Sequence, residues 1–143
     1  MDQVIIILTG ILGSTMTFFV SHRFNQGPVR ASALLSLIIG LFFYFFPNTL
    51  NPYLSSNIPV VFIGTSFIGM ISTTTKRSYV HLTIAGLLFS IIYINKNNQF
   101  DGFGGALGAL AFIALLITFA FSFAFTKGIH RLKLLLKVKK KNR

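Results

Sequence analysis

The sequence predicts an all-α integral membrane protein with five transmembrane helices, and three observations indicate this fold class. Of the 143 residues, 53% are hydrophobic and only 10% are charged, whereas a soluble domain carries about 25% charged side chains. The apolar residues form five long runs between short polar segments. The basic residues gather in alternate segments, which is typical of a multi-spanning membrane protein.

A helix needs roughly 20 apolar residues to cross the hydrocarbon core of a membrane, and lengths of about 17 to 25 residues are tolerated. Five runs reach or approach that length: Val4 to Ser21, Pro28 to Phe46, Pro59 to Thr75, Ser78 to Ile94, and Phe103 to Thr126. At about 1.5 Å per residue, the third and fourth runs reach only about 26 Å. We therefore expect those two helices to stand upright or to pack among longer neighbours.

Prolines mark the ends of two of these runs. Pro28 suits the first position of a helix, because its missing N–H would have no intrahelical partner there. We expect Pro47, Pro52 and Pro59 to bracket an irregular connection between the second and third spans.

Lys and Arg in short loops set the orientation, because basic segments stay on the cytoplasmic side. Arg23 and Arg30 lie between the first and second spans, and Lys76 and Arg77 lie between the third and fourth. Among the segments expected outside, only the last carries a basic residue, Lys96. The sequence therefore predicts an N-terminus outside and a C-terminus in the cytoplasm, with residues 1–126 as the transmembrane domain and residues 127–143 as a basic tail.

The tail carries eight of the 13 Lys and Arg residues. A basic residue near an anionic leaflet contributes about 1 kcal/mol of attraction, so the tail lysines are candidates for contact with anionic lipid: Lys133, Lys137, Lys139, Lys140 and Lys141. Leucines between them permit an amphipathic helix on the membrane surface. The alternative is a solvated signal that only fixes the topology, and we expect no nucleic acid as a partner.

The chain also resembles itself at an offset of 46 residues. The segment RASALLSLIIGLFFYFF, from Arg30, matches KRSYVHLTIAGLLFSII, from Lys76, and places Gly40 on Gly86. We interpret the match as two and a half copies of a helical hairpin inserted in the same sense, that is, parallel repeats. The alternative is five unrelated helices that share a narrow set of residue types.

Small residues four apart recur on every span. They permit the close backbone approach on which helix association in lipid depends. The predicted packing residues are Gly10, Ser14, Ser36, Gly40, Thr65, Gly69, Gly86, Gly104 and Gly108, with Ser32 and Ser90 in the same rows. We favour this structural role over ligand binding.

One of the two acids in the chain, Asp101, precedes the fifth span. Its carboxylate suits a helix N-cap, but it could also face a cavity and collect a cation or proton. Under the second interpretation a polar path would include Asp101, Thr65, Ser66 and His81. His81 is an ionisable residue within a span, which favours a functional hypothesis, although a simple hydrogen bond would also explain it.

The composition excludes several kinds of chemistry. The chain has no cysteine, three histidines and two acids, so we expect no thiol chemistry, no metal site and no cofactor. No catalytic motif is present, and we do not expect an enzyme. The sequence favours a packing or scaffolding subunit of a larger membrane complex or a homo-oligomer, in the cytoplasmic membrane of a bacterium. The alternative is a small-solute or ion transporter with a path between protomers.

Overall fold

All regular secondary structure in the described part of the chain is helical. The computed structural model describes residues 1–24, 27–71, 79–95 and 105–141, with side chains described as far as residue 125. Its elements are α1 (Asp2–Arg23), α2 (Pro28–Phe45), the short 3-10 turn η1 (Pro47–Thr49), α3 (Pro52–Gly69), α4 (Tyr79–Asn95) and α5 (Ala106–Lys141). The predicted all-α class is confirmed.

Three of these helices have the length and apolar character needed to cross a membrane. They are α1, α2 and the segment Ala106–Phe125 of α5. The apolar helix α4 has 17 residues and is shorter than these. Helix α3 has 18 residues, but its first turns carry Ser55, Ser56 and Asn57, which lower its apolar character. The helices are thus compatible with a membrane protein.

Helix α3 differs from the expected third span. It begins at Pro52 rather than Pro59 and ends at Gly69, so Pro59 lies inside the helix instead of bounding an irregular connection. The reason is that the polar residues of the first turns bond within the helix: the Ser56 hydroxyl donates to the Pro52 carbonyl at 3.0 Å and the Asn57 amide to the Tyr53 carbonyl at 2.7 Å. Helices in membranes tolerate proline where neighbouring groups satisfy the backbone.

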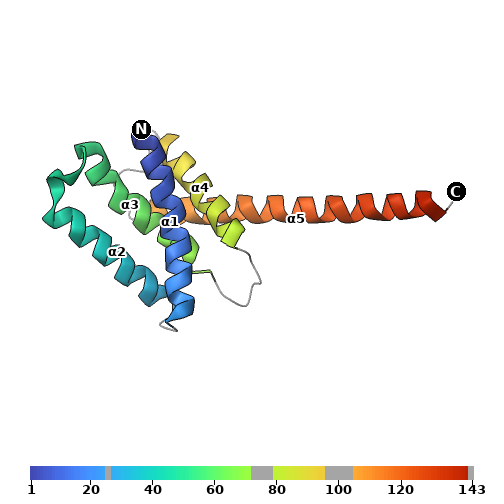
Figure 1. Ribbon diagram of the computed structural model, residues 1–143, viewed down its shortest axis with the longest axis horizontal. Helices are drawn as coiled ribbons and strands as arrows, with labels where there is room; N and C mark the ends of the chain where they lie inside the picture. Colours follow the sequence, from blue (N-terminus) through green and yellow to red (C-terminus); the bar gives the residue numbers. More distant parts are fainter. Residues whose placement is uncertain (25–26, 72–78, 96–104, 142–143) are drawn as a thin grey trace.

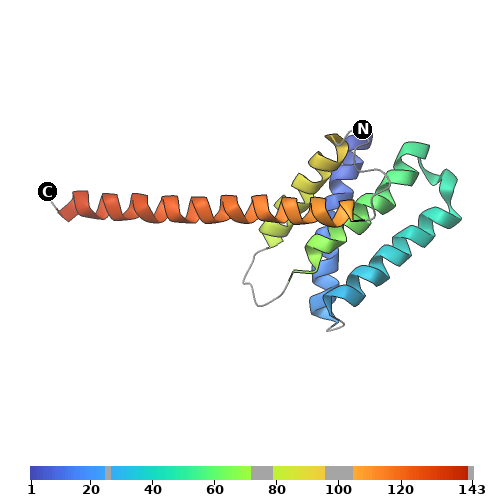
Figure 2. The ribbon, with the colours of Figure 1, turned by 180° about the vertical axis from the view of Figure 1, so that it is seen from behind.

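Helix α1 lies at the centre of the arrangement. It packs mainly against α3 and α4, while α2 lies against α3 and α1, and α5 against α4 and α3. Helices α1 and α3 run in the same direction, and α2 and α4 run back in the opposite direction (Figure 1). Seen from behind, the same order of helices is apparent (Figure 2).

The first four helices form two successive hairpins. The first hairpin consists of α1 and α2, and the second consists of α3 and α4. Each first helix contacts the second helix of the other hairpin, since α1 packs on α4 and α3 packs on α2. The two first helices, α1 and α3, pack on each other and run in the same general direction (Figure 1).

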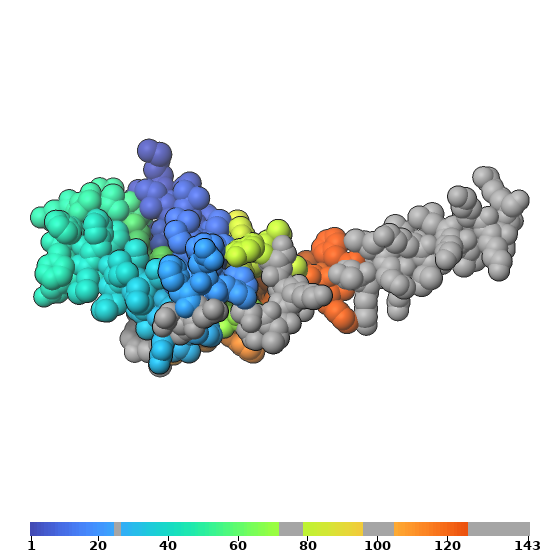
Figure 3. All heavy atoms as spheres, turned by 60° about the horizontal axis from the view of Figure 1, so that its bottom comes forward, coloured from blue at the N-terminus to red at the C-terminus, as the bar shows by residue number. Residues whose placement is uncertain are grey.

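Helix α5 extends far beyond the bundle. It has 36 residues, which corresponds to about 54 Å. Its first half lies beside α4 and α3, and its course is steeply inclined to α1 (Figures 1 and 2). In the space-filling view α5 leaves the bundle at the end opposite to α2 (Figure 3). The helical backbone continues through residue 126 without a break, where the sequence suggested a boundary between membrane domain and tail.

The apolar core is formed by α1, α3, α4 and the start of α5. Its fully buried large side chains include Ile6, Ile68, Phe89 and Leu110. The Phe89 ring lies against Gly64, where an added Cβ would be 3.0 Å from Cε2 of the ring. A side chain at position 64 would therefore displace the largest buried group of the core.

We expect Phe89→Ala to lower the free energy of unfolding by about 3 to 5 kcal/mol, because it leaves a cavity in a closed core. Thermal unfolding of the purified protein in mild detergent measures the effect. Phe45→Ala is the control, since Phe45 is 68% exposed, and we expect it to unfold near the wild-type temperature. Equal shifts in the two variants would contradict the placement of Phe89.

Candidate functional site

The closest backbone approach joins α1 and α4. A Cβ added to Gly86 would lie 2.7 Å from the carbonyl oxygen of Gly10, and one added to Gly10 would lie 3.0 Å from the carbonyl oxygen of Gly86. Neither position has room for a methyl group. The two glycines therefore set the separation of the helices, as small residues do in membrane proteins.

Two serines link the same pair of helices. The Ser14 hydroxyl of α1 lies 3.1 Å from the Leu82 carbonyl of α4. The Ser90 hydroxyl of α4 lies 3.4 Å from the Ile6 carbonyl oxygen of α1. It also lies 3.0 Å from the Gly86 carbonyl oxygen of its own helix. Both serines are fully buried, and interhelical bonds of this kind contribute about 0.6 to 2 kcal/mol each in membrane proteins.

Helix α3 meets α1 through a second set of small residues. A Cβ added to Gly69 would lie 2.6 Å from the Ser14 carbonyl oxygen and 2.7 Å from Cβ of Thr17. Gly13 of α1 faces Thr65 of α3 in the same manner. The Thr65 hydroxyl donates to the Val61 carbonyl of its own helix at 2.8 Å, so its oxygen lies beside Gly13 of α1 without leaving a donor unpaired.

Helices α2 and α3 are joined by serines. The hydroxyls of Ser32 and Ser66 are 2.7 Å apart, and those of Ser36 and Ser66 are 3.4 Å apart. At the repeat offset, position 36 corresponds to position 82, the residue that Ser14 contacts on the other side of the bundle. The two interfaces thus use equivalent positions of α2 and α4.

The predicted packing residues are not all used within this chain. Gly10, Ser14, Ser36, Thr65, Gly69 and Gly86 lie at helix contacts. Around Gly40 and Gly108, no atom beyond the local backbone of the same helix lies within 4 Å of an added Cβ, so the described residues do not make the expected contact with a neighbouring helix. Helix α2 diverges from α1 after its first turns (Figure 1), and only its residues Ala31 and Ser32 are buried. Gly104 lies outside the described residues.

The spacing rule also missed contacts. Gly13 and Thr17 are four residues apart on a second face of α1, so the same rule applied to that face would have found them. Thr17 is fully buried, and its hydroxyl has no hydrogen-bond partner in the described part of the chain. Gly64 has no small residue four positions before it and could not be found in this way.

The residues of the predicted polar path lie on three different interfaces. Thr65 faces α1, Ser66 faces α2, and His81 faces α5. The groove beside His81 includes neither Thr65 nor Ser66. Asp101 lies outside the described residues, as does its expected role as a helix cap. A path through one protomer along these side chains is therefore not formed by the described residues.

His81 lies in a groove of about 470 Å³ between α4 and α5. Its Nε2 atom is 2.8 Å from the Ser122 hydroxyl of α5, and its Nδ1 atom is buried without a hydrogen-bond partner among the described residues. The rest of the lining is mainly apolar: Ile84, Leu88, Ile117, Thr118, Phe121 and Phe125. The groove combines one proton-carrying group with a surface suited to apolar ligands.

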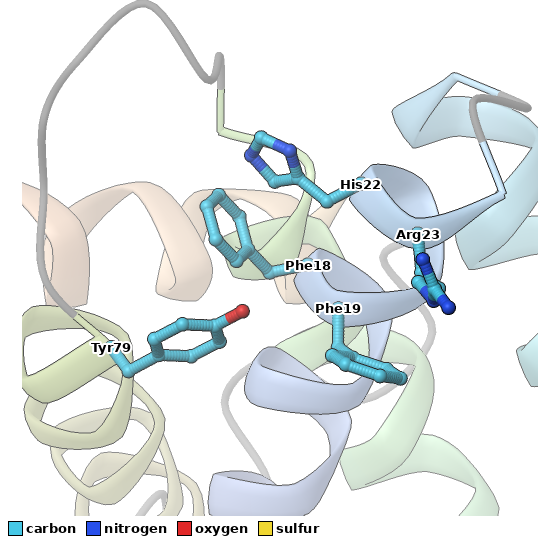
Figure 4. Close-up of a pocket in the computed structure, with 5 residues that line it drawn as sticks. All are labelled: Phe18, Phe19, His22, Arg23 and Tyr79. Atoms are coloured by element: carbon cyan, nitrogen blue, oxygen red, sulfur yellow. The ribbon is translucent and has the colours of Figure 1, made fainter.

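An open pocket of about 420 Å³ lies at the end of α1. Its lining consists of Phe18, Phe19, His22, Arg23 and Tyr79. The Phe18 ring meets His22 and Tyr79 edge to face, with ring centroids 4.6 and 5.4 Å apart. Figure 4 shows the Tyr79 hydroxyl pointing toward the space between Phe18 and Phe19. His22 and Arg23 also suit the last turn of a helix, where the dipole favours positive charge.

The basic tail is helical in backbone as far as Lys141. The side chains of Lys133, Lys137, Lys139, Lys140 and Lys141 lie outside the described part, so the predicted contact with anionic lipid stays a prediction. Among the described residues, no group of three His, Cys, Asp or Glu side chains could hold a metal ion.

Comparisons with protein-family models, curated proteins and solved structures give no match.

Gly40 and Gly86 form a matched pair, because they occupy the same position in the two similar segments 46 residues apart. We expect Gly86→Ala to lower the free energy of unfolding by about 1 to 3 kcal/mol, because the new methyl group would overlap the Gly10 carbonyl. We expect Gly40→Ala to be neutral or to stabilise by up to about 1 kcal/mol, because the site is open and alanine favours the helix. Thermal unfolding in detergent compares them, and destabilisation by Gly40→Ala to the extent of Gly86→Ala would contradict the assignment.

Proposed function

We propose that the chain is a non-catalytic membrane protein that acts as a packing or scaffolding subunit, either in a larger complex or in a homo-oligomer. The observation that carries the proposal is that some small residues lie at helix contacts within the chain and others do not. Those of α1, α3 and α4 fix a closed core, whereas Gly40 has no neighbouring helix within 4 Å of an added Cβ, on a helix of which only Ala31 and Ser32 are buried.

The outward face of α2 supports the proposal further. Its large apolar side chains that are at least 44% exposed are Val29, Leu34, Leu37, Ile38, Leu41, Phe42, Tyr44 and Phe45. Such a surface is far too apolar for water, so lipid or a partner helix must cover it. Close packing with a partner helix would use the small residue Gly40 as Gly86 is used inside the bundle.

The alternating directions of α1, α2, α3 and α4 (Figure 1) support the proposed orientation with the N-terminus outside. Asp2 lies at the start of α1, and Arg23 lies at its end. Because α2 runs back from the end where α1 finishes (Figure 1), Arg23 and Arg30 share one end of the bundle. That end would be cytoplasmic under the rule that basic loops stay inside, in the cytoplasmic membrane of a bacterium as the composition suggested.

A small-solute or ion transporter is the second candidate. The observation that favours it is His81, whose unpartnered Nδ1 could exchange a proton in the groove between α4 and α5. Proton-coupled or solute flux in liposomes that contain the purified protein alone, lost in His81→Gln, would support transport. Absence of flux for a panel of protons, alkali cations and small anions would count against it.

The orientation is tested by adding single cysteines to a chain that has none. We expect a membrane-impermeant maleimide to label Asn48→Cys in intact cells or spheroplasts, because η1 would lie outside. We expect it to label His22→Cys only after the membrane is permeabilised. Both positions are exposed, so burial does not explain a difference. The reverse pattern would overturn the orientation.

Assembly is tested by extraction in gentle detergent with an affinity tag on the tail, followed by mass spectrometry of co-purifying proteins. We expect a partner, or an untagged copy of the chain, at a fixed ratio to the tagged protein. Mixing tagged and untagged membranes only after extraction is the control for association in detergent. A tagged protein that is recovered as a monomer free of partners would contradict the subunit proposal.

A further inference from the structure

A groove of about 750 Å³ runs along the outside of the hairpin formed by α1 and α2. One wall consists of Val20 of α1 and Phe24, the residue that follows α1, and the other consists of Ala33, Leu34 and Leu37 of α2, with Arg30 at the start of α2. Apart from this arginine, these side chains are apolar. The groove therefore has a charged end and an apolar length.

The local sequence explains why the groove stays open. Gly27 has a φ of 80°, a conformation that favours glycine and that lets the chain reverse between the two helices. Ala31 and Ser32 seat the first turn of α2 against the bundle, whereas Leu34 and Leu37 remain 56% and 61% exposed. Ala33 lines the same groove and contributes only a methyl group, which leaves space on the side opposite Phe24.

The charged end of the groove has no anionic partner in the described structure. Arg30 is in the first turn of α2, a turn with no acid and no side-chain cap. The free N–H groups and dipole of that turn therefore add to the positive potential of the guanidinium. The chain has two acids, of which Asp2 lies at the opposite end of α1 and Asp101 lies outside the described residues. No acid in the described part of the chain neutralises Arg30, so the guanidinium is free to bind an anion from another molecule.

We propose that this groove binds one anionic phospholipid, with its phosphate on Arg30 and an acyl chain along Leu34 and Leu37. A guanidinium binds phosphate through two parallel hydrogen bonds, and the volume falls in the range of about 300 to 1,000 Å³ found for small-molecule sites. The site is distinct from the lysines of the tail. It rests on the residence in a membrane that the proposed function requires.

The test uses phosphatidylglycerol that carries a photoreactive diazirine on one acyl chain, added to the full-length protein in mixed-lipid vesicles. After illumination, mass spectrometry of peptides locates and quantifies the cross-links. We expect labelling between residues 20 and 37, and we expect Arg30→Gln to reduce it about fivefold, the effect of one basic residue near a lipid surface. Arg23→Gln is the matched control, because Arg23 lines the pocket on another side of α1, and we expect it to leave this labelling unchanged.

A second variant tests the contribution of the apolar groove separately from that of the Arg30 charge. Ala33→Phe fills the groove without changing any charged residue, and we expect it to remove the labelling. Ala120→Phe is the control, since Ala120 is exposed on α5 and lies outside the groove. Equal labelling by a phosphatidylcholine probe with the same chains would overturn the proposal, as would unchanged labelling in Arg30→Gln or Ala33→Phe.

Failure of the lipid site and failure of the proposed function give different results. Resistance to alkaline extraction from membranes measures residence in the bilayer independently of the probe. A protein that resists extraction but shows no cross-link dependent on Arg30 overturns only the lipid site. A protein that alkaline washing releases overturns both proposals.

Discussion

The structure depends on how closely α1 can approach α3 and α4. Helices in lipid gain little from burying apolar side chains against one another, because the surrounding acyl chains are equally apolar. What remains is contact at short range and hydrogen bonding between helices. Gly10 and Gly86 bring two backbones together, and Ser14 and Ser90 bond across the same interface. Helix α2 and helix α5 are attached to this central set and make fewer contacts with it.

The sequence predicted the helices well where composition changes sharply. The expected spans at Val4 to Ser21, Pro28 to Phe46 and Ser78 to Ile94 fall within two residues of α1, α2 and α4. The third span was placed too late, because a proline and a polar segment were treated as a connection although their side chains bond within the helix. Apolar length determined the end expected for the fifth span, whereas its helical backbone continues into the basic segment, where lysine and leucine favour a helix without any bilayer.

The candidate sites were only partly accessible from sequence. A row of small residues indicates that another helix could approach, but it does not indicate whether one is present, and this is why Gly86 and Gly40 share a pattern and differ in surroundings. The contact between His81 and Ser122 joins residues 41 positions apart on different helices, and no local pattern marks it. Thr65 and Ser66 are neighbours in sequence but face different helices, since successive residues of a helix point about 100° apart.

The unbroken course of α5 has a mechanical consequence. Its buried residues, from Ala106 to Thr118, lie in the half that packs against α3 and α4. The rest of the helix projects beyond the bundle (Figure 1). The contact between His81 of α4 and Ser122 of α5 lies in the middle part of this long helix. A small change of angle at this contact would move the basic end of a rigid helix through a much larger distance. Repacking inside the bundle would thus be converted into displacement of positive charge at a distance.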